Sequence, residues 1–335
     1  SSSEINFDAY VGRNASTRLG INDLDSLQSN NRWNSGFGVF ARYNNIHLMD
    51  DEHVFWQGDH WGYEHTRYWP SEGSVDFYAF APWVPDRILE KNPAPGSNEP
   101  GSNEPPTYLD FPSTLSPVDL LWANAEKQTK NSISSTNGKV KFQFKHATAR
   151  LGLDITANKK LEKNGAVITV EEVNLFGYGK DDYVGVFDME GFLNLKTGKW
   201  HVVTNKDTRW YYAWTPTGTV GKDDDEKYDP TKGTVLKLSA SQLNDTTRII
   251  TNDRNSYIFI VPQTKNEPFY LKITYTVKQG EYEEKVTVRK NLLDVLQPGV
   301  PNQSFTFEEG KAYVFHLKLS LDPVDFSVTV DGKKR

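Results

Sequence analysis

The sequence has no cysteine among its 335 residues. Disulfide bonds, cysteine-ligated zinc, thiol nucleophiles and covalent haem attachment are therefore excluded. It also lacks any apolar run near the roughly 18–20 residues that a membrane-spanning helix needs. With 38 basic and 44 acidic side chains the formal net charge is −6, so the concentrated basic face that binds nucleic acid is not expected.

Motifs for several enzyme classes are absent as well. The sequence has no G-x-S-x-G elbow, no Walker loop and no dinucleotide fingerprint. Glycoside hydrolysis needs two carboxylates in one cleft, and the spacing of the 44 acidic residues singles out no such pair. We expect no catalytic residues, no cofactor and no enzymatic activity; a β-sandwich hydrolase is the least favoured alternative.

Two stretches carry residue types that can hold a metal ion. Residues 50–65 contain His53, His60 and His65 among carboxylates, without the spacing of an HExxH motif. The run Asp223–Glu226 is acidic throughout but does not fit an EF-hand loop. We interpret the first as surface or edge positions of strands and the second as a solvated loop, so no metal site is predicted.

Alternating apolar and polar residues dominate what is present. Ile5, Phe7, Ala9 and Val11 fall on one face of the first expected strand. Helical patterns are short and few; the candidates are Asn22–Gln28, Val118–Glu126 and Ser239–Leu243. Many short strands without interleaved helices predict antiparallel β-sandwiches rather than a βαβ fold.

The length of the chain predicts two domains, with one large β domain as the alternative. Residues 92–106 contain the repeat Gly-Ser-Asn-Glu-Pro twice, and this composition predicts an exposed, dispensable loop. Residues 127–138 form a second polar stretch ahead of a strong strand pattern. We therefore expect an N-terminal domain at 1–138 and a C-terminal domain at 139–335 that folds independently. The start at Ser1, with neither Met nor a signal peptide, is typical of a mature or truncated form.

Aromatic residues are numerous in the first half of the chain. They either stack on sugars as an exposed platform or fill a sandwich core. Their placement within alternating strands favours the core. The residues concerned are Trp56, Trp61, Tyr63, Tyr68, Trp69, Trp83 and Trp122.

The order of several short motifs resembles the fimbrillin family of anaerobic Gram-negative gut and oral bacteria. The motifs lie at residues 37–41 (FGVFA), 61–63 (WGY), 68–70 (YWP), 75–82 (VDFYAFAP), 119–123 (DLLWA) and 140–151 (VKFQFKHATARL). The resemblance spans most of the chain in order, and in the second half it rests on strand layout more than on motifs.

This resemblance implies two transthyretin-like β-sandwich domains in a stalk, tip or anchor subunit of a surface fimbrium. It implies export as an outer-membrane lipoprotein, with contact to the membrane only through a lipid anchor outside this sequence. The implied partners are other fimbrial subunits; surface glycans or proteins of host or bacteria are further candidates. A carbohydrate-binding surface lipoprotein is the alternative function.

In polymerising members of the family, a trypsin-like protease cuts after an Arg that follows the first strand, and a terminal strand of another subunit fills the groove. Carried to this sequence, the candidate processing residues are Arg13 and Arg18, in the Gly/Asn/Ser/Thr-rich segment 12–20. The candidate plug is Ile5, Phe7, Ala9 and Val11, and the candidate donor strand is Val324, Phe326, Val328 and Val330. Both sets alternate with the period that strand addition needs.

Overall fold

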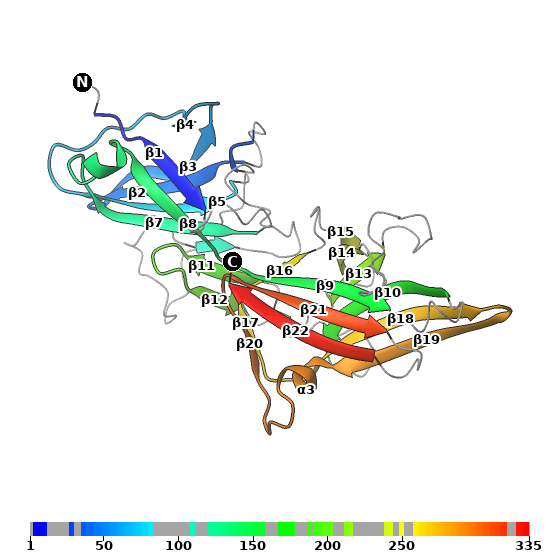
Figure 1. Ribbon diagram of the computed structural model, residues 1–335. Coiled ribbons are helices and arrows are strands. Elements are labelled where there is room, and N and C mark those ends of the chain that lie inside the picture. The colour runs from blue at the N-terminus through cyan, green and yellow to red at the C-terminus, as the bar shows by residue number, and fades with distance from the viewer. Residues whose placement is uncertain are drawn as a thin grey trace.

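Figure 1 shows the computed structural model of the protein, in which the described residues form strands with very little helix. The all-β class expected from the sequence is confirmed. The structure describes residues 3–11, 27–29, 35–83, 108–110, 119–157, 167–177, 187–188, 190–203, 211–216, 238–243, 248–250, 257–319 and 326–334.

A seven-stranded sheet carries the first strand and lies at the upper left of Figure 1. Strand β1 runs parallel to β8, and the other neighbouring pairs of this sheet are antiparallel. Its inward side chains form one apolar core, to which β8 contributes Val140, Phe142 and Phe144 from alternate positions. In spatial order the strands are β1 (Phe7–Val11), β8 (Val140–His146), β7 (Leu121–Gln128), β5 (Val75–Ala81), β2 (Phe37–Tyr43), β3 (Ile46–Trp56) and β4 (Trp61–Gly62).

Strand β7 corrects one expectation, because the stretch Val118–Glu126 forms a strand from Leu121 onward and not a helix. Alternate residues from Leu121 to Ala125 face the core of the seven-stranded sheet. Leu120 and Trp122 pack in a different apolar cluster. A strand with apolar neighbours on both faces loses its polar alternation, so its sequence looks helical in a short window.

The second half of the chain forms the main part of four further sheets. The six-stranded sheet has the order β15 (Arg248–Ile250), β14 (Leu238–Leu243), β13 (Tyr211–Pro216), β10 (Val167–Gly177), β18 (Phe269–Gln279) and β19 (Tyr282–Asn291). The four-stranded sheet has the order β16 (Ile258–Ile260), β9 (Ala149–Ala157), β21 (Lys311–Leu319) and β22 (Phe326–Lys334). The small sheets are β12 (Trp200–Val203), β11 (Glu190–Asn194) and β6 (Tyr108–Asp110), and β17 (Gln263–Lys265) with β20 (Phe305–Phe307).

The six-stranded and four-stranded sheets share a second apolar core. Val173 and Ile273 from the larger sheet join Leu153 and Phe315 from the smaller one in this core. Alternate residues of each sheet therefore pack against the other sheet, as in a β-sandwich. Helix α3 (Leu292–Leu296) follows β19 and buries two leucines in the same core.

Of the two other helices expected from the sequence, one is contradicted by the structure and the other lies mostly outside the described residues. The helix expected at Ser239–Leu243 is wrong, because these residues belong to β14. The candidate at Asn22–Gln28 lies mostly outside the described residues. The 3-10 turn at Ser134–Thr136 and helix α3 were not expected from the sequence.

A third apolar cluster joins the two halves of the chain, with Phe80 and Trp122 on one side and Leu193 and Val261 on the other. The Trp122 indole N–H donates a hydrogen bond to Glu309 Oε1 at 2.9 Å. The domain boundary after residue 138 stays a prediction. Strand β8, which that boundary assigns to the second domain, pairs with β1 and β7 and packs in the first core.

Candidate functional site

The first strand buries alternate side chains in the core of the seven-stranded sheet. Ile5, Phe7 and Ala9 are no more than 2% exposed, and Val11 packs partly buried against the same core. Tyr10, on the opposite face, is 40% exposed. The side-chain orientation expected from the alternation is therefore confirmed for the described residues.

Aromatic rings surround Phe7 on several sides. Its ring stacks on Phe142 with centroids 5.6 Å apart and planes at 18°. It meets Phe77 edge-on at 5.7 Å, Phe37 edge-on at 6.3 Å and Tyr63 tilted at 5.6 Å. These rings belong to β8, β5, β2 and the segment after β4, so β1 lies in a slot whose walls come from four parts of the chain.

One edge of the first strand forms a continuous ladder with β8. The register pairs Phe7 with Val140 and continues to Val11 with Phe144. The ladder is extended backwards by a hydrogen bond from the Val140 N–H to the Asn6 carbonyl at 2.8 Å. Within the described part of the chain, β1 has a strand ladder only with β8.

The other edge is held at its start by residues 63–69, which we call the strap. The Ile5 N–H donates to the Arg67 carbonyl at 2.9 Å, and the Ile5 carbonyl accepts from the Tyr63 hydroxyl at 2.6 Å. The Trp69 N–H donates to the Ser3 carbonyl at 2.8 Å. Further along, the Ala9 N–H bonds to the carboxylate of its neighbour Asp8 at 3.0 Å.

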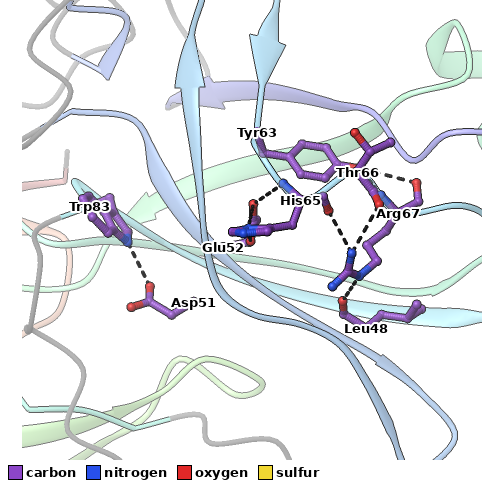
Figure 2. Close-up of polar contacts among 8 residues, drawn as sticks. All are labelled: Leu48, Asp51, Glu52, Tyr63, His65, Thr66, Arg67 and Trp83. Carbon is purple, nitrogen blue, oxygen red and sulfur yellow. Dashed lines mark hydrogen bonds and ion pairs between the residues drawn. The ribbon is translucent and has the colours of Figure 1, made fainter.

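Arg67 and Tyr63 give the strap its shape, as Figure 2 shows. The Arg67 guanidinium donates to the carbonyls of Leu48, His65 and Thr66 at 2.9, 3.3 and 3.3 Å. The His65 ring lies 3.0 Å from a carboxylate oxygen of Glu52. Burial raises the pKa of the Tyr63 hydroxyl, which keeps it protonated and able to donate.

The outward face of β1 carries a small polar cluster. The Tyr10 hydroxyl donates to Asp8 Oδ2 at 2.8 Å, and the Lys141 ammonium lies 4.4 Å from the centre of the Tyr10 ring. The hydrogen bond to Asp8 raises the pKa of Tyr10. These contacts stabilise the exposed side of the β1–β8 pair without joining the core.

The remaining strand-exchange residues are only partly described. Arg13, Arg18 and Val324 lie outside the described residues, as do residues 92–106 and the acidic run Asp223–Glu226. Phe326 to Lys334 form β22, whose backbone pairs antiparallel with β21 over nine residues at the edge of the four-stranded sheet.

The three histidines of residues 50–65 have separate partners. His53 bonds to the Ser35 carbonyl at 2.8 Å and stacks on Trp83 at 3.9 Å. His60 contacts its neighbour Asp59, and His65 contacts Glu52. In the part of the chain that the structure describes, no three His, Asp or Glu side chains gather as a metal site would require.

One buried ionisable pair lies in the second half of the chain. Lys265 is 6% exposed, and its ammonium lies 3.9 Å from Asp188. Burial lowers the pKa of Lys265 and raises that of Asp188. Gln263 clamps the Asp188 backbone by accepting from its N–H at 2.8 Å and donating to its carbonyl at 3.0 Å. The opposite charges of Lys265 and Asp188 at this distance form an ion pair, which we interpret as structural.

The aromatic residues of the first half mostly serve the core, as expected. Trp61, Trp69 and Trp122 are buried, and Trp56 and Tyr63 pack partly buried against the first core. Tyr68 is 55% exposed. The described members of this group therefore do not form an exposed row of rings for sugar stacking.

The strap is the part of the candidate site that the sequence did not predict. Its Tyr63 meets Ile5 across 58 positions of sequence. Its aromatic residues appear in the sequence as candidates for a core and as parts of the family motifs. No local pattern shows that a hydroxyl and a carbonyl there bond to the first strand. Among the described residues, no helix is long and apolar enough to cross a membrane.

The chain is similar to fimbrial proteins along most of its length. It is 20% identical over 349 residues to the fimbrium subunit Fim1C of Phocaeicola vulgatus, covering 95% of this chain and 86% of that protein. A fimbrial protein from Bacteroides vulgatus has a similar fold, with a TM-score of 0.58 at 16% identity and 99% of each chain covered.

A candidate cell adhesion protein from Bacteroides uniformis also has this fold, with a TM-score of 0.52, 14% identity, and 99% of this chain and 97% of that chain covered. The family described as fimbrillin-like matches residues 27–332, which is most of the chain. The family expected from the sequence motifs is thus confirmed, and the chain belongs to the fimbrillin-like family.

Proposed function

We propose that this fimbrillin-like protein is a structural or adhesive subunit of a surface fimbrium and has no catalytic activity. We propose further that its first strand is a plug, which an extended segment of another subunit can replace. Family membership supports the first statement. Two observations support the second: Ile5, Phe7 and Ala9 are buried, and among the described residues β1 forms a ladder with β8 alone.

The burial energy suits a plug that is held but replaceable. Burying Ile5 and Phe7 contributes roughly 3–6 kcal/mol, at about 1.5–3 kcal/mol for each large apolar side chain. Loss of the strand would expose the rings of Phe37, Phe77 and Phe142 as an apolar groove. Such a groove favours a new strand with apolar residues at alternate positions, because main-chain bonds supply affinity and the side chains set the register.

The last strand remains the candidate donor. In this structure β22 forms a nine-residue ladder with β21, so it would have to leave that ladder before filling a slot on another molecule. An extended segment that is not already paired avoids this loss. A neighbouring unlike subunit would supply such a segment. Exchange between like subunits instead requires β22 to leave β21, and multimer formation by the cut chain alone tests that form.

Release of the plug requires a cut in the chain after the first strand. Arg13 and Arg18 are the proposed sites for a trypsin-like protease. The proposed location is the outer surface of the cell, with attachment through a lipid anchor outside this sequence.

Limited trypsin digestion of the full chain, followed by mass and size measurement, tests the proposal. We expect a cut after Arg13 or Arg18, loss of the N-terminal peptide, and species larger than the monomer that grow with protein concentration. The variant with Arg13→Gln and Arg18→Gln is the matched control and should stay monomeric. A cut chain that remains strictly monomeric counts against polymerisation.

A further inference from the structure

The strap contacts the main chain of the first strand. Three hydrogen bonds join the strap to this main chain, at the N–H and carbonyl of Ile5 and at the carbonyl of Ser3. Every residue except proline carries these groups, so such contacts accept many sequences. The aromatic rings of the slot therefore select apolar side chains, whereas the strap binds the backbone of the strand whatever its sequence.

Tyr63 links these two kinds of recognition. Its hydroxyl donates to the Ile5 carbonyl at 2.6 Å, and its ring lies 5.6 Å from the ring of Phe7. The Tyr63 side chain thus contacts both the backbone of Ile5 and the ring of Phe7, two residues further along the strand. An occupant in this geometry has an extended residue two positions before its buried aromatic residue and runs parallel to β8.

The strap is anchored to elements that do not belong to the first strand. Arg67 donates to the Leu48 carbonyl on β3, and Glu52 on β3 holds His65. The Arg67 N–H donates to the Tyr63 oxygen at 3.2 Å, which helps to place the hydroxyl (Figure 2). These contacts do not involve residues 3–11, so the strap is preorganised for a new occupant.

We propose that the strap, residues 63–69, is a docking subsite for the leading residues of any strand that fills the slot. Tyr63 and Arg67 are its positioning residues, and the occupant is an extended peptide that presents free backbone groups two residues before an aromatic side chain. This inference rests on the proposed strand exchange. In this proposal the strap slows the departure of the bound strand, because it still holds the leading residues after the apolar side chains have begun to leave the slot.

The test uses the full chain with residues 14–17 replaced by the recognition sequence of a site-specific protease. After cleavage, release of the N-terminal peptide is followed by mass spectrometry in an excess of a synthetic peptide of residues 1–11. Tyr63→Phe keeps the ring and removes the hydrogen bond to Ile5, so release should be about fivefold faster, as expected for one neutral hydrogen bond. Tyr68→Phe makes the same change at a 55% exposed ring of the same strap and should leave the rate unchanged.

A second synthetic peptide, residues 6–11, keeps Phe7 but lacks Ser3 and Ile5, whose backbone groups bond to the strap. It should compete less well than residues 1–11 against wild type, and this disadvantage should shrink in Tyr63→Phe. Equal release rates for wild type, Tyr63→Phe and Tyr68→Phe would overturn the docking subsite while leaving strand exchange standing.

Retention of the cut peptide in every variant would instead refute strand exchange. Amide hydrogen exchange in the uncut chain then tests whether the strap holds the leading residues, independently of strand exchange. Residues 5–7 should exchange about fivefold faster in Tyr63→Phe than in Tyr68→Phe if the strap holds the leading end. Unchanged protection of residues 5–7 would overturn the docking subsite.

Discussion

Replacing Phe7 by alanine should loosen the first strand far more than replacing its outward neighbour Tyr10. Phe7 is 1% exposed and has four aromatic rings within 6.3 Å, whereas Tyr10 is 40% exposed. Truncation of a buried Phe costs about 3–5 kcal/mol. Truncation of a surface tyrosine with one exposed hydrogen bond should cost less than about 1 kcal/mol.

The loss should be local if the first strand is a separable element. A change of about 3 kcal/mol corresponds to roughly a hundredfold in an opening equilibrium, because 1.4 kcal/mol is a factor of ten. Amide hydrogen exchange should therefore quicken about a hundredfold at residues 7–11 in Phe7→Ala. Protection in the central strand β5 should change much less.

Two results would refute this reasoning. Equal acceleration in Phe7→Ala and Tyr10→Ala would show that the aromatic cage does not hold the strand. Acceleration of β5 to the same extent as residues 7–11 would show that the first strand opens only when the whole sheet unfolds. A plug that leaves by itself would then be untenable.

Three further predictions test other parts of the structure. Burial raises the pKa of the Tyr63 hydroxyl above its ordinary 10.0. The stability that the protonated hydroxyl contributes is therefore fully present below pH 10 and is lost as the pH rises through the raised pKa. In urea unfolding, the difference in unfolding free energy between wild type and Tyr63→Phe should shrink above pH 10. Gly198→Ala should lower stability by about 1–3 kcal/mol in thermal unfolding, because a Cβ there would stand 2.1 Å from the Trp122 indole ring. Gly280 also has a positive φ but faces open space, so Gly280→Ala is the control and should cost less. Two fragments test the predicted boundary after residue 138. Residues 147–335 should unfold cooperatively and stay monomeric, whereas 139–335 carries β8 without its partners β1 and β7 and should aggregate more readily. Cooperative unfolding of 139–335 as a monomer would support the boundary after residue 138.

The sequence predicted those parts of the fold in which one face of a strand is buried. The alternation of Ile5, Phe7 and Ala9 predicted the buried face of the first strand. The strong strand pattern after residue 138 became β8, which buries Val140, Phe142 and Phe144 from alternate positions. A one-sided pattern follows directly from the period of two, so it is visible without the partner strands.

The sequence could not reveal features set by distant partners. Burial of β7 between two apolar clusters removed its alternation and suggested a helix. The pairing of β8 with β1 depends on residues about 130 positions apart in sequence, as in the register of Phe7 with Val140. The strap bonds to the first strand through one backbone carbonyl, one backbone N–H and one hydroxyl, and these groups leave no pattern that the local sequence reveals.

The most direct test tethers the first strand to β8. Tyr10 and Gln143 are register partners with exposed side chains, and the chain has no cysteine of its own, so Tyr10→Cys with Gln143→Cys introduces a single disulfide. The chain is cut by trypsin after the first strand, and its size is measured with the disulfide oxidised and reduced. If the first strand is a replaceable plug, the cut protein should form multimers only after the disulfide is reduced, when the N-terminal peptide can leave. The same size with the disulfide oxidised and reduced, whether monomer or multimer, would contradict this account.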